Sequence, residues 1–333
     1  MTQESPPIQP NAPTEVFSPP AFSRRMLAGL ARVRRQYLAA QARHRAFVVA
    51  AQLLYAAVFV GWLIYYHVWP APDLVGLGLL VCALLTMRLF SFLRDWTPLV
   101  LLTLGYVWLA GIDPGVVGRA HVDFPITVDR FLFLGRLPTT WIQAHLWTPP
   151  HLHAYDYFVA ILYPLHFAAP LVLGMVLWTW DRRAYWRFSA AFVLLCYAGL
   201  ATYLLFPMAP PWWAASLHRI PPVPSILGAV HFGGSPHTII LLTRYFGVNL
   251  VAAMPSIHAA IPVLVWLVVW EVWPKWGWAA VLYPLGMSFA VIYLGEHYAI
   301  DVIVGWTYAA AAFSLVWQGE PLLRRLRWTG HRA

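Results

Sequence analysis

Long apolar stretches alternate with short polar breaks along most of this chain of 333 residues. A helix of about 20 apolar residues is long enough to cross the hydrocarbon core of a bilayer. Because the apolar runs come close to that length, we expect an all-α integral membrane protein, a polytopic helical bundle with about eight transmembrane helices. The predicted spans are residues 47–69, 74–93, 97–112, 157–180, 185–206, 254–273, 276–295 and 301–317.

Two of these spans, 254–273 and 276–295, are separated only by Pro274 and Lys275. So short a break predicts a helical hairpin, which returns both of its ends to one membrane face. Polar residues of catalytic types lie at that open end, and together they indicate a phosphoryl-transfer site. They are Ser256 and His258 on the first arm, and Glu296, His297 and Asp301 after the second.

The remainder of the chain divides by composition. Residues 1–22 are rich in proline and lack periodicity, which predicts a disordered tail. Arginines alternate with apolar residues over 23–45, which predicts an amphipathic segment on the cytoplasmic membrane surface. We therefore expect N-terminal transmembrane helices at 46–112, a catalytic membrane domain at 113–320 and a basic cytoplasmic tail at 321–333.

Composition and charge narrow the function. Hydrophobic residues make up 60% of the chain and charged residues 11%, a mixture that no ordinary soluble core uses. The net charge of +9 lies mainly beside apolar spans, so it fits anionic lipid head groups, and we expect no nucleic-acid partner. Under the positive-inside rule the arginine-rich ends are cytoplasmic. With about eight crossings, both termini lie inside, and the catalytic candidates lie at the outer face of the plasma membrane.

The first motif is Pro255-Ser256-Ile257-His258, which has the features of a helix start. Proline is tolerated in a first turn, and serine is a good N-terminal cap. Free N–H groups at such an end, together with the helix dipole, favour a phosphate group. His258 is then placed to protonate a leaving oxygen. The alternative is a structural histidine at the outer end of an apolar span.

The second motif runs from Gly295 to Asp301 and reads GEHYAID. His297 and Asp301 are four residues apart, so on a continuous helix they share one side. Asp301 can then accept a hydrogen bond from one ring nitrogen of His297 and leave the other nitrogen as a nucleophile. The alternative is a capping aspartate beside an interfacial histidine. The pair of motifs, joined by one hairpin, favours the catalytic interpretation.

These motifs resemble a known family. PSIH and GEHYAID are similar to the second and third motifs of the type 2 phosphatidic acid phosphatase superfamily. EHYAID followed by an apolar span resembles its inositol phosphorylceramide synthase and sphingomyelin synthase branch. The loop elements DRFLFLGRLPTTW and FPMAPPWW resemble an inositolphosphotransferase-type subgroup with bacterial members. The resemblance covers residues 113–317 and implies a bacterial membrane enzyme with a catalytic core of about six helices.

The resemblance also implies a role for each site residue. His297 is the nucleophile, Asp301 supports it, His258 is the acid, and Ser256 binds phosphate. The implied reaction moves a phosphorylated head group, plausibly phosphoinositol, from a phospholipid donor to a lipid alcohol acceptor through a phosphohistidine. A lipid phosphatase that uses water as the acceptor, and a non-catalytic lipid transporter, are the alternatives.

The sequence departs from the phosphatase branch at two points. Val291 stands where that branch has an arginine, and Arg130 with Arg136-Leu137-Pro138 matches its first motif only loosely. The charge of a phosphate must still be neutralised. The outer-side arginines are Arg119, Arg130, Arg136, Arg219 and Arg244. We prefer Arg136 and Arg244, then Arg130, with an interfacial anchor as the alternative role for each.

The outer loops also contain many histidines, which raises the question of a metal. No cysteine or carboxylate cluster accompanies them at ligand spacing, so we predict no metal and no cofactor. His166 lies inside a predicted span, where a functional histidine and a packed, hydrogen-bonded one are both open. The oligomeric state does not follow from the sequence.

Overall fold

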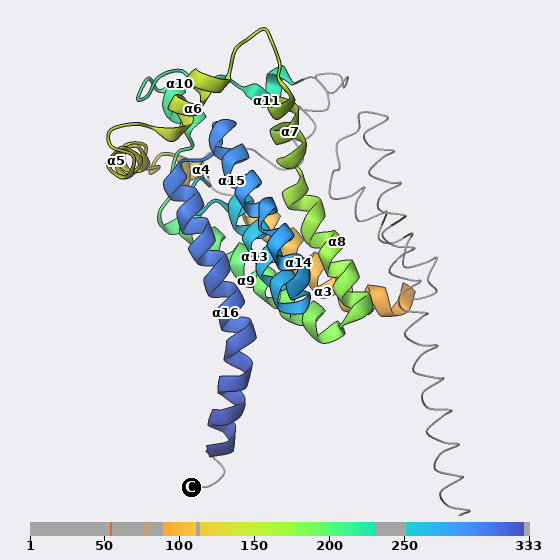
Figure 1. Ribbon diagram of the computed structural model, residues 1–333. Coiled ribbons are helices and arrows are strands. Elements are labelled where there is room, and N and C mark those ends of the chain that lie inside the picture. Colours follow the sequence, from red (N-terminus) through yellow and green to blue (C-terminus); the bar gives the residue numbers. More distant parts are fainter. Residues whose placement is uncertain are drawn as a thin grey trace, which may run out of the picture. The chain divides into compact units, whose positions relative to one another are not determined.

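The described part of the chain is helical, as predicted (Figure 1). The predictions for the tail at 1–22, the basic segment at 23–45 and the first span fall outside the described residues, as does most of the second span. Within the described ranges no strand forms, and only isolated bridges pair Met208 with His121 and with Ala252. The computed structural model describes residues 89–110, 114–230 and 251–329, with Leu54, Gly78 and Val81.

Several described helices are long and apolar enough to cross a membrane. They are α9 (Arg182–Leu205), the stretch Pro274–Tyr293 that contains α14 (Pro274–Ala280) and α15 (Leu282–Tyr293), and Ala299–Gly319 within α16 (Ala299–Thr329). A further candidate span is the pair α7 (Ala154–Leu162) and α8 (Leu165–Trp180), which bend by 53° at their junction. The apolar helix α13 (Ile257–Val272) is shorter. These helices coincide with the predicted spans from residue 157 onward.

Helix α3 (Leu89–Ala110) passes through the break that the sequence predicts between the second and third spans. Arg94 and Asp95 interrupt the apolar run there, but the carboxylate of Asp95 is buried rather than exposed to solvent. It accepts a hydrogen bond from Nε1 of Trp178 at 2.8 Å and pairs with Arg182. Because its charge is satisfied by neighbouring helices, the helix continues through this position.

Helix α13 is packed on several sides, by α8, α9, α15 and α16. Small residues let its neighbours approach its N-terminus closely, as they do in other membrane helix pairs. A Cβ on Gly199 of α9 would lie 2.8 Å from Cδ1 of Ile257, and one on Gly305 of α16 would lie 2.5 Å from the carbonyl oxygen of Ser256. Two glycines therefore fix where the first turn of α13 sits.

Short helices lie in the two long connections, residues 113–155 and 207–253, and the described ones gather at the end of the bundle where α16 begins (Figure 1). The prolines of the second connection, residues 207–253, favour a rigid, non-helical segment. The structure differs at α10, because a proline in the first turn favours a helix start. The helices are α4 (Pro114–Val117), α5 (Asp123–Leu132), α6 (Pro138–Leu146), α10 (Pro211–Ser216) and α11 (Ile226–Ala229).

Candidate active site

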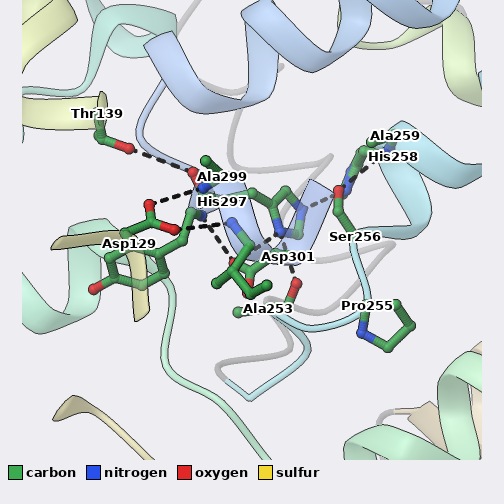
Figure 2. A network of polar contacts seen from close by, with 12 residues as sticks. Asp129, Thr139, Ala253, Pro255, Ser256, His258, Ala259, His297, Ala299 and Asp301 are labelled. Atoms are coloured by element: carbon green, nitrogen blue, oxygen red, sulfur yellow. Dashed lines mark hydrogen bonds and ion pairs between the residues drawn. The ribbon is translucent and has the colours of Figure 1, made fainter. Parts of the chain in front are cut away.

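The predicted hairpin forms and brings the two motifs together. Its first arm is α13, and its second arm is α14 followed by α15. His297 lies in the short connection between α15 and α16, and His258 lies in the first turn of α13. Nδ1 of His258 is 3.1 Å from Nε2 of His297 (Figure 2). The distance is that of a hydrogen bond between the two rings.

The second nitrogen of His297 is held by the backbone. Nδ1 lies 2.9 Å from the carbonyl oxygen of Ala253 and 3.7 Å from Oδ2 of Asp301 (Figure 2). A carbonyl oxygen only accepts, so Nδ1 carries the proton, and Nε2 of the neutral ring carries the lone pair. Nδ1–H of His258 is then the donor in the contact between the rings. His297 is therefore in the tautomer that a nitrogen nucleophile requires, with Nε2 directed towards His258.

Asp301 is buried and accepts hydrogen bonds both from the loop that carries His297 and from the N-terminal cap of α13. Its Oδ2 accepts the N–H of Tyr298 at 2.8 Å, and its backbone carbonyl accepts the N–H of Ser256 at 2.9 Å. Among the described residues Oδ1 has no hydrogen-bond partner. The ion-pair distance to His297 is compatible with the predicted supporting role, while the carbonyl of Ala253 is an orienting group that sequence reasoning missed.

Ser256 is fully buried and caps α13, as its position in the first motif predicts. Its hydroxyl oxygen accepts the N–H of Ala259 at 3.2 Å. Ser256 directly precedes the first turn of α13, which contains His258. The predicted contact of Ser256 with phosphate remains a prediction.

The structure describes two of the three preferred arginines, Arg130 and Arg136. Arg136 is exposed, with its guanidinium 5.9 Å from the centroid of the Trp141 ring. Arg130 is exposed on α5. Within the described ranges, no hydrogen bond or ion pair joins either arginine to the two histidines. Arg244 lies outside the described residues, and Arg219 pairs with Asp123 of α5.

Asp129 is a site residue that sequence reasoning missed. This buried carboxylate of α5 accepts the N–H groups of Ala299 and Ile300, each at 2.9 Å, and so caps α16 from another segment (Figure 2). Burial raises the pKa of Asp129 to about 6, although the two hydrogen bonds oppose that change. Because these first-turn N–H groups are taken, the N-terminus of α13 remains the candidate place for a phosphate.

Tyr163 and His166 enclose His258 and were also missed in this role. The ring of Tyr163 stacks on His258 with a centroid distance of 4.7 Å, and the buried ring of His166 meets it at 4.1 Å in a T-shaped contact. Tyr163 lies in the break between α7 and α8, and His166 lies in the first turn of α8. There the N–H of Phe167 donates to Pro164, which leaves the Tyr163 carbonyl to accept Nδ1–H of His166 at 2.6 Å.

The loop that carries His297 is braced by α6. The hydroxyl of Thr139 donates to the carbonyl of His297 at 3.4 Å, and Nε2 of Gln143 donates to the carbonyl of Tyr293 at 2.7 Å. Beside His297, burial raises the pKa of Glu296, while a hydrogen bond with Trp212 opposes that change. The loop element DRFLFLGRLPTTW, which contains Thr139, therefore positions His297 through its backbone.

No group of three or more histidine, cysteine or carboxylate side chains is arranged to hold a metal ion in the part of the chain that the structure describes. The arrangement instead provides a nitrogen lone pair, a neighbouring imidazole and a helix N-terminus. Those groups are sufficient for nucleophilic attack on phosphorus and for proton transfer to a leaving oxygen.

Comparison with known proteins agrees with the motifs. The family model of the PAP2 superfamily matches residues 126–315, which is more than half of the chain. A phosphoinositol dihydroceramide synthase of Bacteroides thetaiotaomicron is 28% identical over 200 residues, which cover 57% of this chain and 63% of that protein. An inositol phosphorylceramide synthase of Candida albicans is 26% identical over 161 residues, which cover 45% of this chain and 33% of that protein.

A third relative is the inositol phosphorylceramide synthase catalytic subunit of Schizosaccharomyces pombe, with 23% identity over 163 residues. The match covers 45% of this chain and 37% of that subunit. The chain thus spans less than two thirds of the length of the curated relatives that it matches. No solved structure matches the chain.

Proposed function

Because the chain belongs to the PAP2 superfamily, we propose that it is a membrane phosphotransferase that moves phosphoinositol from a phospholipid to the hydroxyl group of a second lipid. The observation that carries this proposal is the 3.1 Å contact between Nδ1 of His258 and Nε2 of His297. The names of the three relatives support phosphoinositol as the transferred group and a ceramide-type lipid as the acceptor.

In the first half of the reaction, Nε2 of His297 attacks the phosphorus atom of the donor. The bond between phosphorus and the diacylglycerol oxygen breaks, and protonated His258 gives its proton to that oxygen. The product is diacylglycerol and a phosphohistidine that carries the inositol group. Since Nε2 has one lone pair, phosphorus must take the place of the His258 proton, so the two rings separate when the donor binds.

In the second half, His258 is neutral and accepts the proton of the acceptor hydroxyl. The hydroxyl oxygen attacks phosphorus, the bond to Nε2 breaks, and His297 regains its lone pair. The carbonyl of Ala253 and the carboxylate of Asp301 hold the Nδ1 side of the ring through both steps. The first half-reaction leaves His297 phosphorylated and His258 neutral, and the second half-reaction returns both residues to their starting states, so the cycle balances without a further reactant.

Charge on the phosphate is neutralised by the first turn of α13, with Arg130 and Arg136 as arginine candidates and Arg244 as a third outside the described residues. A phosphodiester carries one charge fewer than a monoester dianion, so it depends less on the arginine that Val291 replaces. This difference favours a diester donor such as phosphatidylinositol over a monoester.

We further propose that the site lies at the outer face of the plasma membrane, with about eight crossings, about six of them in the catalytic core, and both termini inside. Arg182 and Arg183 support this orientation, because they begin α9 at the end opposite its approach to α13. The lipid substrates then reach the site laterally from the bilayer.

The test supplies inositol-labelled phosphatidylinositol to the purified protein in lipid vesicles, with and without ceramide. We expect a new labelled phospholipid only when ceramide is present, and none from a His297→Ala variant. Release of inositol phosphate at the same rate in both samples, without a new phospholipid, would instead make the protein a hydrolase that uses water as the acceptor with the same histidines.

A further inference from the structure

Helix α5 presents three different faces. One face is buried against the start of α16 and contains Pro125, Ile126 and Asp129. A second face is exposed and polar. A third face is exposed and apolar. Its residues Phe124 and Phe131 are seven apart, so they fall on the same side of the helix. The polar face holds Asp123, Thr127 and Arg130, and the apolar face holds Phe124 and Phe131, with Leu132 at its edge.

The turn after α5 continues the apolar face. Phe131 is 83% exposed, and Leu134 is 94% exposed. Leu134 also adopts a φ of 54°, in the left-handed region that costs energy for a residue with a Cβ. The backbone therefore holds a large apolar side chain outward at the tip of a turn. In water both the exposure and the conformation would be unfavourable, whereas contact with lipid would offset them.

The contacts of α5 with the ends of two candidate membrane spans determine its depth relative to a membrane. Asp129 caps the first turn of α16, and Phe124 packs edge-on against Phe206, which directly follows α9, with a centroid distance of 5.4 Å. Both α16 and α9 are candidate membrane spans. Because the ends of spans lie at the membrane interface, a helix joined to two such ends lies at the same level.

Charges on either side of the turn suit a phospholipid surface. Arg130 precedes the turn and Arg136 follows it, and both are exposed. The ion pair between Asp123 and Arg219 lies at the other end of α5, away from these arginines. In one leaflet of a bilayer the phosphates lie at the surface and the acyl chains lie below them. The exposed apolar residues of the turn suit the acyl chains, and the arginines on either side suit the phosphates.

We propose that α5 and the turn after it form a membrane-binding surface, in which Phe131 and Leu134 enter the acyl region of the leaflet while Arg130 and Arg136 bind lipid phosphates. The occupant is the lipid bilayer itself. Through Asp129 this surface fixes the first turn of α16, so the start of the helix that follows His297 is anchored to the membrane. The proposal does not depend on which reaction the protein catalyses. An arginine that binds a bilayer phosphate does not at the same time neutralise the reacting phosphate, so on this proposal that role falls to the first turn of α13.

Spin labels on the full-length protein in vesicles of phosphatidylcholine and phosphatidylglycerol test this proposal. Cys82 and Cys196 are first replaced by alanine, and single cysteines are placed at Phe131, Leu134 and Thr127. Thr127 is the matched control, because it is exposed on the polar face of the same helix. Power saturation compares collisions with oxygen, which enters the bilayer, and with a water-soluble nickel chelate.

We expect labels at 131 and 134 to collide mainly with oxygen, and the label at 127 to collide mainly with the nickel chelate. Replacing Arg130 and Arg136 together with glutamine should raise nickel collisions at 134. Nickel access at 134 equal to that at 127 would overturn membrane insertion. Spin–spin broadening at 134 that disappears on dilution with unlabelled protein would assign the surface to a second copy instead. Unchanged collisions in the arginine variant would overturn the role of the arginines.

Discussion

The N–H of Ser256 donates a hydrogen bond to the carbonyl oxygen of Asp301 at 2.9 Å. This bond joins the cap of α13 to the first turn of α16. The bond therefore holds the start of α13, which contains His258, at a fixed distance from the start of α16, which follows His297. The close approach also depends on Gly305, because a Cβ there would lie 2.5 Å from the carbonyl oxygen of Ser256.

Replacing Gly305 with alanine should separate the two helix starts and impair catalysis. The clash is with backbone atoms, which cannot rotate away, so α13 must shift relative to α16. A misplacement of about 1 Å can cost on the order of 100-fold in rate, and we expect kcat to fall by about that factor. The measurement is the rate of labelled lipid formation at saturating donor.

Gly319 provides the matched control on the same helix, since a Cβ there would meet no atom within 4 Å. Gly319→Ala should leave kcat unchanged and stabilise the helix by about 1 kcal/mol, the difference in helix propensity. Equal activity of the two alanine variants would show that the close approach of Gly305 does not position the site.

We expect His166 to affect the rate of turnover through its contact with His258. His258→Ala should lower turnover of the natural donor by about 100- to 10,000-fold, the range for general acid–base catalysis. A donor with an activated leaving group needs no protonation, so much of that loss should disappear with it. His166→Asn removes the ring that contacts His258, and we expect a loss of about tenfold with the natural donor only.

The double variant distinguishes this role from a general effect on folding. In the His258→Ala background, His166→Asn should cost little further activity, because the residue through which it acts is gone. If His166→Asn slows both donors equally, and its effect multiplies with that of His258→Ala, His166 is only a structural residue.

The proximity of the candidate residues could be predicted from the sequence for a simple physical reason. Two apolar runs with a two-residue break can return only to one membrane face, so Ser256, His258 and His297 had to lie near one another. Asp301 follows His297 by four residues, about one helical turn, so the spacing alone predicts that the two side chains lie close together.

Other parts of the site could not be predicted. Asp129 caps α16 from 170 residues away, and a single aspartate in an apolar loop carries no signal of that pairing. The acceptor for Nδ1 of His297 is a backbone carbonyl, that of Ala253, which leaves no trace in side-chain patterns. The stacking of Tyr163 on His258 depends on the 53° bend after α7, whose direction the sequence does not specify.

The raised pKa of Asp129 predicts a pH-dependent stability. Burial raises this pKa from its ordinary value of 3.8 to about 6, so the folded protein holds the proton more tightly than the unfolded chain. The resulting stabilisation is complete below about pH 4 and is lost as the pH rises through the folded-state value. Asp129→Asn stays neutral, so its stability should rise relative to the wild type between these pH values.

The measurement is the midpoint of thermal unfolding of both proteins in detergent at a series of pH values. Asp123→Asn is the control, because Asp123 is exposed on the same helix. A constant difference between Asp129→Asn and wild type from pH 4 to pH 7 would contradict a raised pKa at Asp129.

Asp95, which makes no contact with His258 or His297, should contribute strongly to stability. Asp95→Ala removes the acceptor of Trp178 Nε1–H and the carboxylate that contacts Arg182, and losing hydrogen bonds to a charged, buried carboxylate costs about 1.5–3 kcal/mol. Asp181→Ala removes only an exposed cap of α9, which should cost about 1 kcal/mol. Unfolding of the two variants by denaturant compares these values, and equal losses would contradict burial of the Asp95 charge.

The stereochemical course at phosphorus tests the central claim, transfer through a phosphohistidine at His297, most directly. A phosphatidylinositol analogue with one non-bridging oxygen replaced by sulfur is supplied as a single stereoisomer together with ceramide. Each in-line displacement inverts the configuration, so two successive displacements, on and off Nε2 of His297, should give a product with retained configuration. Inversion would mean that the acceptor hydroxyl attacks the donor directly, and would contradict the covalent intermediate.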